Sequence, residues 1–163
     1  METKDLLRSG LARAWSVFEM TLDELSDGEL LLRPVDSANH LAWQLGHLVA
    51  SEHRLGEMIK AGGMPALPDG FADRYTKETS ADDDPAHFLT KAEYLSLYNV
   101  QREGLLKLLD SIPAADLDNP APESIQRIAA DVGNIFMLAG DHQLMHSGQC
   151  TVVRRKLGKK IAF

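Results

Sequence analysis

The sequence predicts an all-α protein in which four long helices pack as an antiparallel-type bundle. Apolar residues recur at intervals of three and four along four segments of roughly 20 to 26 residues, the spacing of amphipathic helices. No segment shows the alternation of apolar and polar residues that marks a β-strand. Turn-forming segments separate the four helices, and 163 residues suit one domain. We therefore expect a single four-helix bundle over residues 1–163.

The first two predicted helices cover residues 6–25 and about 38–59. The apolar positions of the first are Leu7, Leu11, Trp15, Phe18, Leu22 and Leu25. Pro34, in the connection SDGELLLRPVDSAN, prevents one continuous helix. The second helix is expected to end at AGGMPALPDG, because paired glycines and two prolines stop a helix.

Two further helices follow a long irregular segment. Residues 61–89 contain clusters of Gly, Pro and Asp, and a loop of that length in a compact domain is often functional, for example as a cover over a site. The sequence TKAE at residues 90–93 has the form of a capping box and predicts a third helix to about Ile112. A fourth helix, over residues 131–157, has an aspartate in the N-cap position and Gly158 at its end.

Composition and charge exclude several classes of partner. No apolar run is long enough to span a membrane, and METKDLLRSG lacks the apolar core of a signal peptide. A net charge of −7 argues against a protein that binds the phosphates of nucleic acids. The only cysteine, Cys150, cannot form an intramolecular disulfide and fits a reducing compartment. We therefore expect a cytoplasmic protein with no membrane or nucleic-acid partner.

Two of the six histidines lie four residues apart in the last predicted helix. In DHQLMHSGQ, His142 and His146 differ by about 40° around a helix, so both imidazoles can reach one point. Such a pair commonly forms half of a metal site, although packing also produces it. Gln143 stands where the helix of a zinc protease carries its glutamate base, which argues against that mechanism. The Glu-x-x-His motif of di-iron bundles does not occur.

A third ligand must come from another helix, and His47 in LAWQLGHLVASEH is the candidate. The competing interpretation is a core histidine satisfied by hydrogen bonds, and the residues alone leave both open. His40, two turns earlier, is predicted at the rim of a pocket, His53 is predicted at the surface, and His87 has no evident partner. Three neutral nitrogens suit zinc, nickel or a similar divalent ion with an open coordination position.

Together, SANHLAWQLGHLVASEH and AGDHQLMHSGQCTVVRRKLG resemble the DinB-like (DinB/YfiT) superfamily. Its pattern is an apolar helix that ends in a histidine, then a late helix with His-x-x-x-His, a following Gly-Gln and an end similar to Arg-x-Leu-Gly. The residues that match the later part are Gly148, Gln149, Arg155, Leu157 and Gly158. The resemblance covers nearly the whole chain, with residues 61–112 the least diagnostic.

The resemblance implies a four-helix bundle with a crossed, non-sequential helix order, often a homodimer. It also implies a divalent metal ion, most often zinc or nickel, and the ligands carried over by position are His47, His142 and His146. Members with known activity include thiol-dependent S-transferases and a mycothiol-dependent isomerase, so the family constrains the site better than the substrate.

Our first hypothesis is an enzyme whose metal ion activates a low-molecular-weight thiol or water and delivers it to a small electrophilic molecule, as an S-transferase or hydrolase. The second is a metal-binding or stress-response scaffold without catalysis. The third is a plain helical interaction domain whose histidines are satisfied in the core.

Three further residues are predicted near the histidines. Gln149, one turn beyond His146, is expected to brace a ligand histidine, or else to orient substrate. Trp43 is expected in the core, with the wall of the pocket as the alternative. Cys150, about 80° from His142 on the same side of the helix, is expected to be a small buried hydrophobe, with a fourth ligand or reactive thiol as the alternatives.

Overall fold

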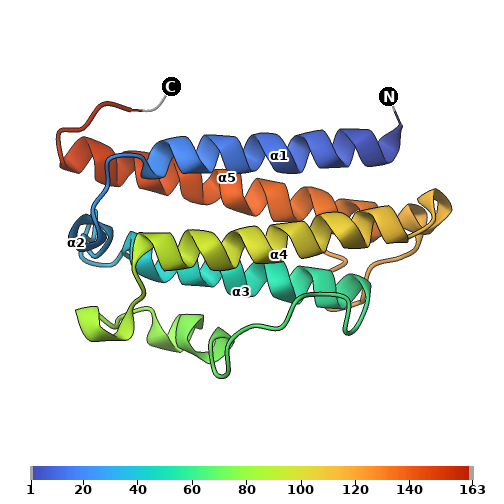
Figure 1. Cartoon of the computed structure of the whole chain (residues 1–163), viewed down its shortest axis with the longest axis horizontal. Coiled ribbons are helices and arrows are strands. Elements are labelled where there is room, and N and C mark those ends of the chain that lie inside the picture. The colour runs from blue at the N-terminus through green and yellow to red at the C-terminus, as the bar shows by residue number, and fades with distance from the viewer. Residues whose placement is uncertain (1, 162–163) are drawn as a thin grey trace.

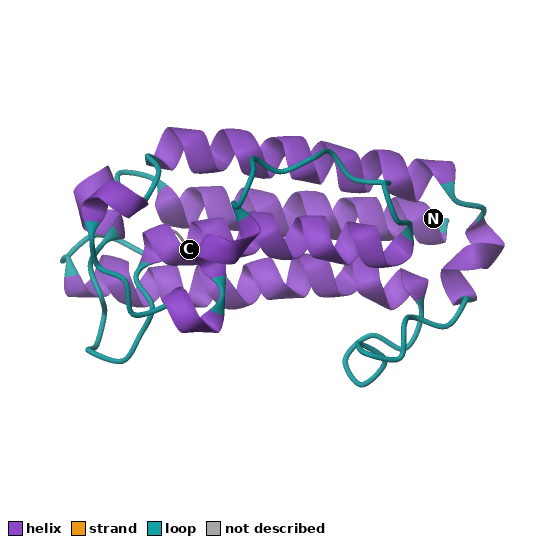
Figure 2. Ribbon diagram, turned by 90° about the horizontal axis from the view of Figure 1, so that it is seen from below, coloured by secondary structure: helices purple, strands orange, loops and turns teal. Residues whose placement is uncertain are grey.

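The computed structural model describes residues 2–161, which form helices, turns and loops and contain no β-strand (Figure 2). The long helices are α1 (Thr3–Leu22), α3 (Leu41–Ile59), α4 (Lys91–Ser111) and α5 (Val132–Lys156). The short elements are α2 (Asp27–Leu30) and the 3₁₀ helices η1 (Ala72–Tyr75), η2 (Lys77–Thr79), η3 (Pro85–His87) and η4 (Ala114–Asp118). The all-helical class predicted from the sequence is confirmed.

The long helices lie side by side, but not in the order of the chain (Figure 1). α1 packs against α5, α3 packs against both α4 and α5, and α1 also contacts α4. α1 and α5 run in the same direction, and α3 and α4 run together in the opposite direction (Figure 1). The expectation of antiparallel neighbours is therefore wrong for two packed pairs, α1 with α5 and α3 with α4.

The parallel arrangement of α3 and α4 explains the long segment between them. A chain that leaves the end of one helix must return along its length before it can start a parallel neighbour. Residues 60–90, which include η1, η2 and η3, make this return (Figure 1). The length of the segment thus has a topological cause, and its position beside α3 brings it near the histidines.

Two helix starts agree with the expected caps. The Thr90 side chain accepts a hydrogen bond from the backbone N–H of Glu93, and the Glu93 carboxylate accepts one in return. The Asp131 side chain accepts from the backbone N–H of Asn134 at 2.7 Å. Each cap satisfies N–H groups that lack a partner within the helix, so α4 and α5 begin where the sequence predicted.

Two other boundaries differ from the prediction. α1 ends at Leu22, three residues early, because Asp23 is extended and Glu24 has a φ of 61°. Leu25 is nevertheless 1% exposed, since the chain folds it back under the helices. α3 begins at Leu41 and not near residue 38, because His40 is its N-cap.

The core consists of two apolar clusters with a buried polar layer between them. One cluster surrounds Phe18 and Tyr94, and the other surrounds Leu105 and Phe136. In the layer, Glu52 of α3 accepts hydrogen bonds from Arg102 Nε at 2.5 Å and from the Tyr98 hydroxyl at 2.5 Å. Arg102 also donates to Leu11 O on α1 and to Gln143 Oε1 on α5. Side-chain or backbone atoms of α1, α3, α4 and α5 therefore all take part in the polar layer.

Among the described residues, no helix has both the length and the apolar character needed to cross a lipid bilayer.

Candidate metal centre

Three histidines from two helices meet where α3 faces α5. His47 projects from α3, and His142 and His146 lie one turn apart on α5. One ring nitrogen from each histidine can be chosen so that all three nitrogens lie within 4.8 Å of one another. Within residues 2–161, no other three possible metal ligands converge in this way. The Nε2 atoms of His142 and His146 are 3.2 Å apart. The His47 ring stands edge-on to the His142 ring, with 5.1 Å between centroids.

The spacing of these nitrogens is compatible with one divalent ion. Tetrahedral ligands with bonds of about 2.0 to 2.1 Å lie about 3.3 Å apart. The 3.2 Å between His142 and His146 matches that separation. The His47 nitrogen has to approach by at most about 1.5 Å, which a small side-chain rotation supplies. A set of three nitrogens without a carboxylate is typical of borderline-soft ions.

Burial keeps the three imidazoles neutral. Desolvation lowers the pKa of His142 to about 4, and the electrostatic effects of His47 and Arg54, each of which would repel a second positive charge, act in the same direction. Desolvation and its two histidine neighbours lower the pKa of His146 to about 3. The pKa of His47 is also lowered, mainly by burial. At neutral pH each ring therefore offers a lone pair, and a metal ion displaces no proton when it binds.

Gln44 orients His146 from the opposite helix. Its Oε1 lies 2.8 Å from His146 Nδ1, while its own Nε2 donates to Asn39 O at 2.7 Å. Because the amide oxygen can only accept, Nδ1 carries the proton and the lone pair of Nε2 points toward His142. Sequence reasoning missed Gln44. The available signal was a buried glutamine inside the apolar stretch LAWQLGH, one turn before His47.

The loop between α3 and α4 contacts His47 through Tyr75 of η1. Tyr75 O lies 3.4 Å from His47 Nδ1, and the Tyr75 ring packs on Gly46 so closely that a Cβ there would come within 2.2 Å of it. The Tyr75 hydroxyl bonds the Tyr94 hydroxyl at 2.8 Å. The loop is thus fixed to α3 beside the histidines, as the hypothesis of a cover requires.

Trp43 is a core residue, as expected. It is 4% exposed, as a core residue would be, and its ring stacks on that of His47 with 4.9 Å between centroids and 10° between planes. Its Nε1 donates to Thr79 Oγ1 at 3.3 Å. Trp43 therefore fills the core and packs directly against the ring of His47.

The structure does not place His40 at a pocket rim. Its Nδ1 accepts from the Trp43 N–H at 3.1 Å, its Nε2 lies 3.0 Å from Asp82 O, and its exposure is 0%. The prediction assumed that His40 belongs to the helical face of His47. Because the helix begins one residue later, the ring instead caps the helix and faces the loop.

Gln149 and Cys150 also lie apart from the imidazole cluster. Gln149 is exposed, because it sits about 100° from the middle of the buried face of α5. The amide that braces a histidine is that of Gln44, so the brace was assigned to the wrong glutamine. Cys150 is 0% exposed, and its Sγ donates to Thr21 O of α1, while burial raises the pKa of its thiol. It occupies the position of a small buried side chain.

The two remaining histidines have partners elsewhere. His53, expected at the surface, is half-buried with Nδ1 at 3.1 Å from Pro65 O and 3.2 Å from Gln101 Oε1. His87 is exposed and pairs with Asp82 at 2.8 Å. Neither reaches the three-histidine cluster.

A family model described as the DinB superfamily matches residues 11–150. The chain belongs to the DinB superfamily. The matched span holds all three clustered histidines, whereas Arg155, Leu157 and Gly158 lie beyond it. No curated protein matches this DinB superfamily chain. Its function must therefore be argued from its own site.

Proposed function

We propose that this DinB superfamily chain is a metalloenzyme that holds zinc or nickel through His47, His142 and His146. The observation that carries the proposal is the convergence of three neutral imidazoles, two of them with Nε2 atoms 3.2 Å apart. A divalent ion held there would supply the Lewis acidity that lowers the pKa of a thiol or water at an open coordination position. The reaction proposed is transfer of that thiol or water to a small electrophile.

The site has a side through which a small molecule can enter. His142 and Ser51 line a cavity of about 240 Å³ between α3, α5 and the segment before α5. Structural metal sites are closed by protein ligands, whereas catalytic sites keep an accessible position. The cavity therefore favours an enzyme over a scaffold that merely binds metal. Gln44 and Trp43 hold two of the rings, so that the third faces the opening.

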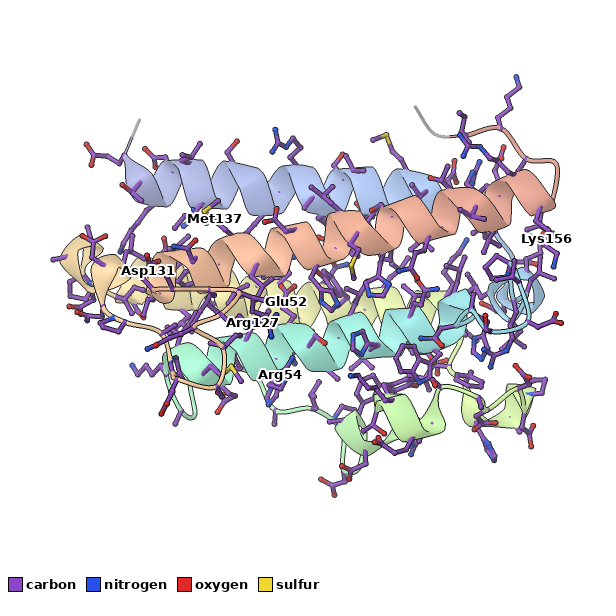
Figure 3. All side chains as sticks on the ribbon, turned by 180° about the vertical axis from the view of Figure 1, so that it is seen from behind. Glu52, Arg54, Arg127, Asp131, Met137 and Lys156 are labelled. Atoms are coloured by element: carbon purple, nitrogen blue, oxygen red, sulfur yellow. The ribbon has the colours of Figure 1, made fainter. Side chains whose placement is uncertain are left out.

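The superfamily architecture belongs to the same proposal. We infer a four-helix bundle with crossed helix order, supported by the packing of α1 on α5 and by the parallel course of α3 and α4. We also propose a homodimer formed through α1 and α5. Large apolar side chains on these helices are exposed, namely Leu6, Met137, Met145 and Val152. Met137 lies on α5 beside α1 (Figure 3). Light scattering of the wild type and of Met137→Glu tests the dimer, and a monomeric wild type would contradict it.

Elemental analysis tests the metal centre. We expect about one zinc or nickel per chain in the purified wild type, loss of the metal in His47→Ala and in His142→Ala, and retention in His87→Ala, whose histidine is exposed and outside the cluster. No stoichiometric metal in the wild type, or equal metal in His47→Ala, would overturn the proposal.

A transfer assay tests the catalytic part. The metal-loaded protein is incubated with 1-chloro-2,4-dinitrobenzene and with cysteine, glutathione or coenzyme A, and product is followed with and without chelator. We expect turnover that requires at least one of these thiols and disappears with chelator. A protein that holds metal yet shows no activity toward any thiol or toward ester hydrolysis would favour the scaffold.

A further inference from the structure

The cavity beside His142 is shaped for a small, mainly apolar molecule. Its volume is about 240 Å³, below the roughly 300 to 1,000 Å³ of pockets that hold drug-sized ligands. Its apolar lining is Leu55, Met58, Ile125, Ile128 and Leu138. Ile128 remains 67% exposed, so water contacts an apolar side chain that a ligand would cover. An apolar ligand body would therefore be stabilised here by burial.

One cation, Arg54, lines this cavity, and none of the lining residues is acidic although the chain carries a net charge of −7. Within residues 2–161, no carboxylate lies within ion-pair distance of the Arg54 guanidinium, whereas Arg33, Arg102 and Arg154 each have such a partner. A guanidinium is a fork of donors that matches a carboxylate, and in an apolar recess it favours an anionic ligand.

The nearby carboxylates of α3 are already engaged, which explains why Arg54 is unpaired. Glu52 points into the core and accepts from Arg102 and Tyr98. Glu57 accepts from the backbone N–H groups of Gly62 and Met64, at 2.7 and 2.9 Å. These contacts direct both carboxylates to other donors, and neither is within ion-pair distance of Arg54.

Arg54 lies on the same face of α3 as His47 (Figure 3 labels Arg54). Seven residues separate the two, which is about two turns, a difference of about 20° in direction and about 10 Å along the axis. Ser51 lies between them and also lines the cavity. Arg54 and His142 both line the cavity, one from α3 and the other from α5. The recess therefore joins the imidazole cluster to an anion-binding end.

We propose that this recess selects the electrophilic substrate, a small molecule with an apolar body and one carboxylate that Arg54 binds. The assignment to a substrate rests on the proposed metal-dependent function, whereas the binding of the anion does not. With the carboxylate held by Arg54, the apolar chain lies along the apolar lining and its opposite end is directed toward His142, which lines the same cavity.

Binding of hexanoate and of its neutral analogue hexanamide tests the anion site. Amide resonances of metal-free protein are followed by NMR during each titration, for the wild type, for Arg54→Met and for Arg155→Met. Arg155 is the matched control because it is also exposed but lies at the far end of α5. We expect the wild type and Arg155→Met to bind hexanoate about tenfold more tightly than hexanamide, and Arg54→Met to lose that preference. A preference that survives in Arg54→Met, or no shift at the lining residues at millimolar hexanoate, would overturn the proposal.

The same ligand in nickel-loaded protein tests its orientation. The paramagnetic ion broadens nearby protons, so we expect the terminal methyl of hexanoate to broaden more than the protons next to its carboxylate. The reverse order would place the carboxylate at the metal and overturn the proposal. A wild type that takes up neither zinc nor nickel but binds hexanoate through Arg54 would overturn the proposed function alone. A wild type that holds nickel and lacks the preference for hexanoate would overturn the anion site alone.

Discussion

Gln44 and His146 join the two helices of the candidate metal centre by a hydrogen bond of 2.8 Å. We expect Gln44→Ala to lower metal affinity by about 10- to 100-fold, because the His146 ring loses the group that fixes its tautomer and direction. Competition with a chromophoric chelator measures the affinity. Gln149→Ala, at an exposed glutamine of α5, is the control and should leave affinity unchanged. Equal affinities for wild type and Gln44→Ala would show that the bond does not orient the ligand.

Glu52 and Arg102 form a buried ion pair whose disruption is expected to destabilise the fold. Removal of one partner leaves a buried charge without compensation, so Arg102→Met should lower the free energy of unfolding by about 3 to 5 kcal/mol. Glu103→Gln removes a carboxylate that lies 3.9 Å from Lys107 at the surface. This change should alter the free energy of unfolding by less than about 1 kcal/mol. Urea denaturation measures both variants. Similarly small changes in the free energy of unfolding for Arg102→Met and Glu103→Gln would contradict the importance of burial.

Gly46 and Tyr75 are packed so closely that an added methyl group forces the loop from α3. We expect Gly46→Ala to lower the free energy of unfolding by about 1 to 3 kcal/mol and to speed proteolysis within residues 60–90. Gly10→Ala is the control, since a Cβ there meets nothing within 4 Å and should stabilise the helix by up to about 1 kcal/mol. Thermal unfolding and limited trypsin digestion distinguish the two. Unchanged digestion of Gly46→Ala would refute the docking role of Tyr75.

His87 and Asp82 give the loop a pH-dependent contact. The hydrogen bond and the charge of Asp82 raise the pKa of His87 above 6.5. A raised pKa means that the contact stabilises the folded loop below pH 6.5 and that this contribution is lost as pH rises through the folded pKa. A backbone hydrogen bond from Asp84 and the His87 contact lower the pKa of Asp82. The stabilisation of the loop by ionised Asp82 is therefore lost only at acidic pH, as pH falls through that lowered pKa.

NMR titration of the His87 ring checks this contact. We expect a midpoint above 6.5 in the wild type and a return toward 6.5 in Asp82→Asn. The effect on global unfolding should be small, because the pair is exposed to solvent. A midpoint at or below 6.5 in the wild type would contradict the pairing.

Local signals predicted the helices well, and their mutual arrangement less well. The caps at Thr90 and Asp131 depend on residues within one turn, so they could be predicted from the sequence. The start of α3 was placed too early because its cap is His40, a residue type that is not among the usual N-caps. The parallel course of α3 and α4 follows from contacts between distant segments, which periodicity does not record.

The same distinction between local signals and contacts of distant residues holds for the candidate site. The spacing of His142 and His146 is local to one helix and suggested half of a metal site, with packing as the alternative, whereas His47 was assigned through the family resemblance. Gln44 was missed because its partner lies 102 residues away. Arg54 was missed because the sequence does not show the apolar cavity that it lines, and without that cavity an exposed arginine is not a candidate binding residue.

The polar layer in the core also sets how far the helices can slide past one another. Glu52 and Gln143 Oε1 can accept from Arg102 at one height only, since a shift by one turn would place each of these residues against apolar neighbours. The layer thus fixes how α3 and α5 are aligned along their axes. The imidazoles of His47 and His146 meet at the same level because Arg102 of α4, which touches neither of them, bonds both Glu52 of α3 and Gln143 of α5.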